Sequence, residues 1–128
     1  MAACPPPAPP TPATLPPTQA AALRRALAYI DANLQQPVLV EQMAAAACVS
    51  RFHLARLFRA GTGMSPTAYL RQRRIEHAQQ LLHAGGLKVS QIASRLCFFD
   101  QSHFVRSFRA VTGCTPRHFA RRSLRPGA

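Results

Sequence analysis

Two stretches of the chain carry arginine and histidine at the same spacing. Residues 50–66 read SRFHLARLFRAGTGMSP, and residues 100–116 read DQSHFVRSFRAVTGCTP. Aligning the shared Phe-Arg-Ala triplets pairs His53 with His103, Arg56 with Arg106 and Arg59 with Arg109. A guanidinium can donate two hydrogen bonds to guanine O6 and N7, and it can also neutralise a phosphate. The repeated pattern therefore indicates chemistry directed at a polyanion.

Apolar spacing predicts that both stretches are helices with one buried face. Leu54, Leu57, Phe58 and Gly61 follow the i, i+3, i+4, i+7 pattern of an amphipathic helix. The matching inner set in the second copy is Phe104, Ser107, Phe108 and Val111. The outward faces then hold Arg51, Phe52, His53, Ala55, Arg56 and Arg59 in the first helix, and Gln101, Ser102, His103, Val105, Arg106 and Arg109 in the second.

These outward faces suit the major groove of double-stranded DNA. Arginine can pair with guanine, glutamine with adenine, and small apolar groups can meet a thymine methyl. In a helix-turn-helix the N-terminal part of the second helix enters the groove, which here selects residues 51–56 and 101–106. Phosphate contacts, which set affinity and register, are expected from the other arginines: Arg51, Arg59, Arg109 and Arg117.

The duplication extends upstream of these helices and predicts the fold. Four residues of the first copy recur in the second, with one extra residue there: Val40, Gln42, Ala44 and Cys48 match Val89, Gln91, Ala93 and Cys97. Each unit is therefore a short helix, a turn and a longer helix. Two copies are too few for a solenoid, and we expect an all-α domain.

Helix signals divide the chain further. We expect helices at about 18–34, 40–48, 51–60, 66–83, 89–96 and 101–112, and a short last helix from 116. Thr18, Ser50 and Asp100 are expected caps, and Gly61 and Gly63 should end the third helix. The DNA-binding domain would span 18–122, with helix-turn-helix units at 38–64 and 88–114 joined by a long helix at 65–84.

Composition narrows the class of protein. The 128 residues hold 16 basic side chains, 15 of them arginine, against 4 acids, which gives a net charge of +12. Such a charge favours a nucleic-acid or anionic-membrane partner over plain solubility. The apolar runs are too short for a membrane span and no targeting segment is evident, so a cytoplasmic, nucleoid-associated protein is expected.

The cysteines and the ends of the chain carry weaker signals. Cys48 and Cys97 occupy matched positions and are expected to be reduced thiols in the core. Residues 1–17 hold most of the 12 prolines, so we expect a polyproline-like disordered arm, a docking peptide or the remnant of a linker. Residues 123–128 form an expected basic tail.

The arrangement of both copies resembles the DNA-binding domain of AraC/XylS-family transcription regulators. The resemblance covers about residues 20–122 and rests on two motifs in order: Ser50, Leu54, Arg56, Phe58, Gly63, Tyr69, Arg74, Ala78, Leu81 and Leu82, then Ile92, Ala93, Phe98, Phe104, Arg106, Phe108, Gly113, Thr115 and Pro116. It implies seven helices with two helix-turn-helix subdomains joined by a long central helix. It also implies action at promoters, with RNA polymerase as a further partner.

Carried over by position, the resemblance implies a set of base contacts: Phe52, Ala55 and Arg56 in the first recognition helix, and Gln101, Ser102, His103 and Arg106 in the second. The sequence departs from the family pattern at Cys97, where a glycine is usual, and at Phe119-Ala120, where tyrosine and arginine are usual. In length the chain resembles short stand-alone members, so no effector pocket is expected. Because the two outward faces differ, the site should be asymmetric, and the tandem units favour binding as a monomer.

Three other classes of protein were weighed. The four carboxylates are scattered and the five histidines lack metal-ligand spacing, so we expect no catalytic residue, metal or cofactor. A charge-only nucleoid-type binder would not need Gln101, Phe52 or Ser102 at groove-entry positions. A membrane-active cationic helix is disfavoured because caps interrupt the helices and their apolar faces match a globular core.

Arg74 is expected to brace the long helix rather than to contact phosphate.

Overall fold

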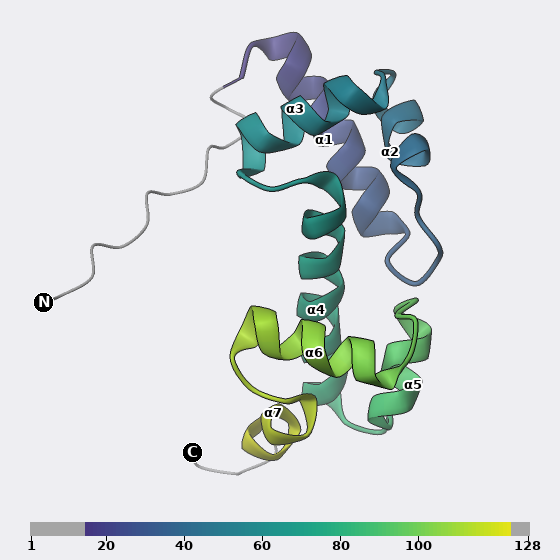
Figure 1. Ribbon diagram of the computed structural model, residues 1–128, viewed down its shortest axis with the longest axis vertical. Coiled ribbons are helices and arrows are strands. Elements are labelled where there is room, and N and C mark those ends of the chain that lie inside the picture. Colours follow the sequence, from purple (N-terminus) through teal and green to yellow (C-terminus); the bar gives the residue numbers. More distant parts are fainter. Residues whose placement is uncertain (1–14, 124–128) are drawn as a thin grey trace, which may run out of the picture. The chain divides into compact units, whose positions relative to one another are not determined.

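The fold of residues 15–123 consists of helices, and no strand occurs among them, as the computed structural model shows (Figure 1). In chain order the helices are α1 (Pro17–Ala32), α2 (Val40–Ala47), α3 (Arg51–Thr62), α4 (Pro66–Ala84), α5 (Val89–Arg95), α6 (Gln101–Thr112) and α7 (Pro116–Ser123). The predicted all-α class and seven helices are confirmed for this part of the chain. None of these helices is long and apolar enough to cross a membrane.

The chain divides into two compact units. Among the described residues, unit 1 contains 15–30 and Leu39–Tyr69, and unit 2 contains Asp31–Val38 and 70–123. In unit 1 α2 packs on α3, and in unit 2 α5 packs on α6 in the same order, with α7 also in contact with α6. The duplication seen in the sequence is therefore a duplication of the helix-turn-helix.

Unit 1 is built on a small apolar core under α3. Its largest fully buried side chains are Leu23, Ile30, Met43, Leu54, Leu57 and Phe58. The guanidinium of Arg25 donates to the Ala47 carbonyl oxygen at 3.0 Å, which ties α1 to the end of α2. One face of α3 packs on this core, and the opposite face is exposed to solvent.

Unit 2 is organised by a row of aromatic rings. Phe104 lies 5.1 Å from Phe98 and 5.8 Å from Phe108, and Phe108 lies 5.6 Å from Phe119, between ring centroids. The surrounding core residues come from α4, α5 and the turn after α5: Ile75, Ala78, Leu82, Ile92, Ala93 and Leu96. Since Phe104 and Phe108 are fully buried, α6 is held by its aromatic face.

The two recognition helices begin in the same way. The Ser50 hydroxyl accepts from the His53 amide at 3.1 Å, and an Asp100 carboxylate oxygen accepts from the His103 amide at 2.7 Å. These bonds satisfy amides that the first turn of a helix cannot pair internally. Both predicted caps are confirmed.

Several sequence-based expectations are corrected near helix ends. Pro17, the first residue of α1, precedes the expected cap Thr18, and α1 stops before Leu34. Gly61 does not end α3; it is buried inside the helix against Leu23, and Gly63 is the left-handed residue that follows the last turn. Val111, expected on the inner face of α6, is 43% exposed.

Neither matched cysteine lies in the core as expected. Cys48 is exposed and Cys97 is half-buried. Both have left-handed backbone, with φ of 60° and 62°, just after α2 and α5. This conformation lets the chain reverse and bond back to the helix: the Cys48 amide donates to the Ala45 carbonyl at 3.1 Å, and the Cys97 amide to Ser94 at 3.2 Å.

The expected proline-rich arm, apart from residues 15–17, and the expected basic tail, apart from Ser123, lie outside the described residues, as does Cys4.

Candidate nucleic-acid interface

Most side chains of α3 that were expected to face outward are exposed, but His53 is half-buried. Arg51, Ala55, Arg56 and Arg59 are exposed, and Phe52 is 70% exposed. The Arg51 guanidinium lies 5.1 Å above the centre of the Phe52 ring. This contact holds a flat apolar surface and a cation together at the second residue of the helix.

Two alanines on α3 leave a shallow surface depression. It is lined by Ala55, Arg56, Arg59 and Ala60. The small side chains of Ala55 and Ala60 beside the two arginines leave room for a backbone or a base edge to approach the helix closely. The depression lies on the face that sequence reasoning assigned to DNA.

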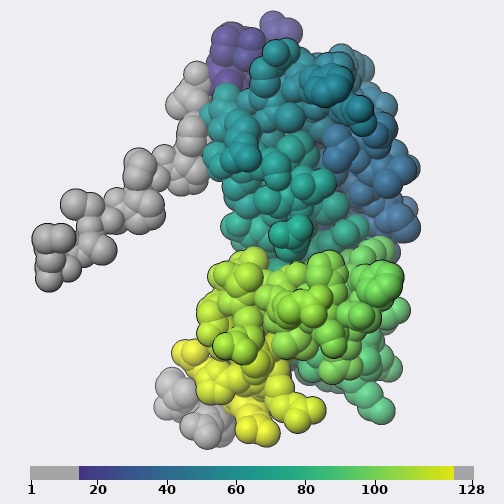
Figure 2. Space-filling model, in the orientation of Figure 1, coloured from purple at the N-terminus to yellow at the C-terminus, as the bar shows by residue number. Residues whose placement is uncertain are grey.

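On α6, most of the expected contact residues are exposed as well. Gln101, Ser102, Arg106 and Arg109 are all exposed, and Figure 2 shows the side chains of α6, coloured lime green, on the surface of unit 2. The exposed set combines amide, hydroxyl and guanidinium donors on one helix.

His103 differs from its neighbours on α6. It is half-buried, and its ring stands edge-on to Phe98 with centroids 5.5 Å apart. Its Nδ1 atom is buried and has no hydrogen-bond partner within residues 15–123. The sequence placed His103 fully outward, but Phe98 of the preceding turn covers part of the ring.

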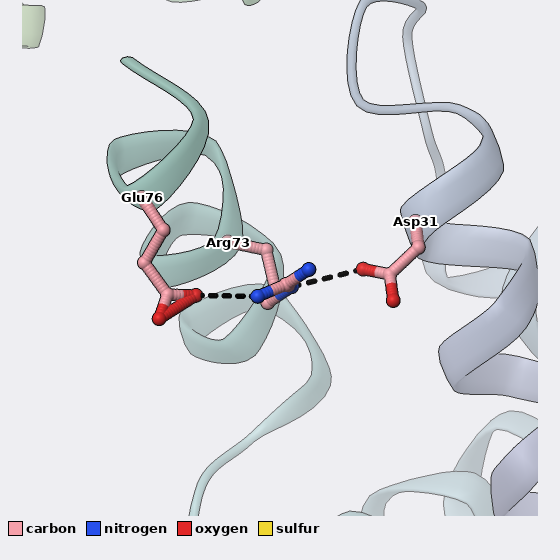
Figure 3. A network of polar contacts seen from close by, with 3 residues as sticks. All are labelled: Asp31, Arg73 and Glu76. Carbon is pink, nitrogen blue, oxygen red and sulfur yellow. Dashed lines mark hydrogen bonds and ion pairs between the residues drawn. The ribbon is translucent and has the colours of Figure 1, made fainter. Parts of the chain in front are cut away.

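Each of the four acidic side chains makes an ion pair with an arginine or a hydrogen bond to a backbone amide. Arg73 donates to Asp31 at 2.9 Å and to Glu76 at 2.8 Å (Figure 3). The hydrogen bond to Asp31 is the main cause that raises the pKa of Arg73, with a further contribution from Glu76. Glu41 lies 3.4 Å from Arg51, and Asp100 caps α6.

These bonds leave most of the positive charge unbalanced. Among the described residues no further carboxylate remains to neutralise Arg56, Arg59, Arg106 or Arg109. Exposed guanidinium groups of this kind attract phosphate and release its counterions when they bind.

Arg74 is a structural residue of unit 2. Its Nε donates to the Leu34 carbonyl at 3.1 Å, and a terminal nitrogen donates to the Gln36 carbonyl at 2.8 Å. Burial lowers the pKa of this guanidinium. The expectation that Arg74 braces α4 is confirmed, because both donors hold the segment that follows α1.

The last helix adds further exposed cations. Arg117, Arg121 and Arg122 are exposed on α7. The Thr115 hydroxyl accepts from the His118 amide at 3.1 Å and caps this helix. Phe119, one of the two departures from the expected pattern, packs its ring on Phe108 and anchors α7.

Phe99, to which no sequence pattern assigned a role, is 91% exposed in the turn before α6. The one available signal was the extra residue in the second copy. Within residues 15–123, no group of three histidine, cysteine, aspartate or glutamate side chains could hold a metal ion.

The chain is similar in sequence to a helix-turn-helix family and to bacterial transcriptional regulators. Residues 43–122 match the helix-turn-helix domain family. The chain is 35% identical over 101 residues to the HTH-type transcriptional regulator AlkR of Acinetobacter baylyi, a match that covers 79% of this chain and 33% of AlkR. The chain spans about a third of the length, or less, of the curated relatives it matches.

Two solved structures are similar over most of the chain. A transcriptional regulator of Chromobacterium violaceum, described as AraC-type DNA-binding domain-containing, has a TM-score of 0.79 at 30% identity and covers 83% of this chain and 95% of its own. The DNA-binding domain of AdpA, a global transcriptional factor solved in complex with a target DNA, has a TM-score of 0.74 at 30% identity, with 83% and 97% coverage.

Proposed function

Because the chain belongs to the AraC-type helix-turn-helix family, we propose that it is a sequence-specific DNA-binding regulator of transcription. The observation that carries this proposal is the pair of capped helices, α3 and α6, whose first turns expose side chains suited to base edges. Residues 18–122 form the proposed binding domain. The structure of the AdpA domain with its target DNA supports a duplex as the partner.

The proposed base contacts come from the first two turns of both helices. Arg56 and Arg106 each donate to guanine, and Gln101 pairs with adenine. Phe52 and Ala55 offer apolar surface to thymine methyl groups. Ser102 and the accessible part of His103 complete the proposed set.

The proposed phosphate contacts are the exposed arginines at the edges of these faces: Arg51, Arg59, Arg109 and Arg117. Arg51 already lies near Glu41, so it must exchange this exposed ion pair for phosphate. Such a pair contributes only about 0–1 kcal/mol in water, so the exchange costs little. Two different recognition faces imply an asymmetric site with two blocks about ten base pairs apart, bound by a monomer.

The proposed regulator has no catalytic role. It would act at promoters together with RNA polymerase. A charge-only, sequence-indifferent binder remains the alternative, since the unbalanced arginines alone would give affinity. The exposed Gln101, Ser102 and Phe52 favour sequence reading, because they add no charge.

Selection of sites from random duplex DNA at about 150 mM salt separates the two functions. We expect enrichment of an asymmetric motif with two blocks about ten base pairs apart. Binding without enrichment, weakening steadily as salt rises, would replace the proposed function with the charge-only binder.

A further inference from the structure

The hydrogen bonds of the two turns show where the second copy is longer. In unit 1 the Val49 amide donates to the Ala44 carbonyl at 3.0 Å, and in unit 2 the Phe98 amide donates to the Ala93 carbonyl at 3.0 Å. Val49 and Phe98 are therefore equivalent positions, each one residue after a left-handed cysteine.

The capping residues fix the other side of the insertion. Ser50 follows Val49 directly and caps α3, whereas Asp100, which caps α6, is separated from Phe98 by Phe99. Phe99 is thus the inserted residue, and unit 1 has no counterpart to it.

This inserted phenylalanine is displayed rather than packed. Its side chain is 91% exposed, while Phe104 and Phe108 of the same unit are fully buried. Its backbone is nevertheless fixed on both sides: the Phe98 ring packs 5.1 Å from Phe104, and Asp100 bonds to the first turn of α6. An aromatic side chain on a fixed backbone needs little further ordering to bind a ligand.

The position and surroundings of Phe99 identify the ligand chemistry. It lies at the N-terminal end of α6, the end that enters the groove in a helix-turn-helix. Asp100, the next residue, is exposed and its carboxylate caps α6. Beyond it the exposed side chains include Gln101, Ser102 and Arg106, which suit base edges and phosphates better than an apolar protein surface. Within the major groove, the apolar group that a phenyl ring can meet is the C5-methyl of thymine.

We propose that Phe99 is a specificity-determining residue that contacts a thymine methyl at the edge of the block read by α6. This inference rests on the proposed function of sequence-specific DNA binding. It assigns to unit 2 an apolar contact analogous to that proposed for Phe52, which is 70% exposed on α3. The two contacts stand at different positions relative to their helices, which adds to the asymmetry of the site.

The test is a double-mutant cycle in which a substitution in the protein is combined with a substitution in the DNA and the binding affinity is measured. The full chain and Phe99→Ala are measured on the selected duplex, in which each thymine in turn is replaced by deoxyuridine, which lacks only the methyl group. At one position we expect the unmodified protein to lose about fourfold in affinity. Phe99→Ala should lose roughly tenfold on the thymine duplex and show almost no further loss on the uridine duplex.

Two further variants control for folding and for apolar surface in general. Val111→Ala removes another exposed apolar side chain, at the far end of α6, and should leave affinity and the response to uridine unchanged. Phe99→Leu keeps an apolar side chain and should retain most of the affinity. All three variants should keep the thermal midpoint, since both side chains are exposed.

Three results would overturn the inference. Unchanged affinity of Phe99→Ala on the selected duplex would remove Phe99 from the DNA interface and leave a protein partner as its occupant. An equal loss on thymine and uridine duplexes at every position would exclude a methyl contact. If selection enriched no motif, the proposed function itself would fail and this inference with it, whereas the first two results leave that function intact.

Discussion

Replacing Arg74 tests whether this residue braces unit 2 or binds phosphate. Its two hydrogen bonds, at 3.1 Å to Leu34 and 2.8 Å to Gln36, hold the segment after α1. Bonds from a charged donor contribute about 1.5–3 kcal/mol each, but part of this offsets the cost of half-burying the guanidinium, and the carbonyl of the exposed Gln36 can bond to water instead. We expect Arg74→Ala to lower the free energy of unfolding by about 2–3 kcal/mol.

The assay is urea unfolding at 25 °C together with a thermal scan, in which this loss corresponds to a fall of roughly 8–12 °C in Tm. Arg74→Lys should recover only part of the loss, because a single ammonium group cannot replace a planar fork that reaches two carbonyls. Arg71→Ala is the matched control on α4: Arg71 is exposed, and we expect a change within about 0.5 kcal/mol.

The DNA affinity of Arg74→Ala tests the alternative that Arg74 contacts a phosphate. Below its melting transition the variant should bind duplex DNA within about twofold of the unmodified chain. A stable Arg74→Ala variant that lost affinity equally on all sequences, with a smaller salt dependence, would refute the reasoning and make Arg74 a phosphate contact.

Other substitutions test the local structure of the two helix-turn-helix units. Cys48→Gly and Cys97→Gly should each raise the free energy of unfolding by about 0.5–1 kcal/mol, because glycine adopts positive φ without the strain of a Cβ; a lower Tm would contradict this. Ser50→Ala and Asp100→Ala should each lower it by about 1 kcal/mol in urea unfolding, and an unchanged midpoint would show that the caps contribute nothing. Phe108→Ala should cost about 3–5 kcal/mol by the same assay, and a loss under 1 kcal/mol would show that the aromatic row is not the core of unit 2.

The sequence predicted the elements that local pattern controls. Caps such as Ser50 and Asp100, and inner faces such as Leu54 and Phe104, follow from residue type and helical period within a few positions. The duplication strengthened each assignment because both copies had to satisfy the same pattern. The resemblance to the family implies the same order and number of helices.

The errors arose where tertiary contacts decide the structure. Glycine is a common helix stop, but Gly61 lies inside α3 and allows this helix to approach Leu23 of α1, a residue distant in sequence. Residue type and matched position predicted that the Cys48 and Cys97 thiols are buried, but both residues have left-handed backbone just after their helices, and the turns leave Cys48 exposed and Cys97 half-buried. The exposure of Phe99 could not be predicted, because aligning the two copies shows that the second turn is one residue longer but not which residue is inserted.

The central claim is that both recognition helices read bases, and repeating the site selection with Arg56→Ala and with Arg106→Ala tests it most directly. Each variant should lose base preference in one block while keeping it in the other, at a cost of about 1–3 kcal/mol on the original site. Arg24→Ala, on the exposed part of α1, is the control and should reproduce the full motif. If either recognition-helix variant recovered both blocks unchanged and simply bound all sequences more weakly, that arginine would contact only phosphate and the claim would be contradicted for its helix.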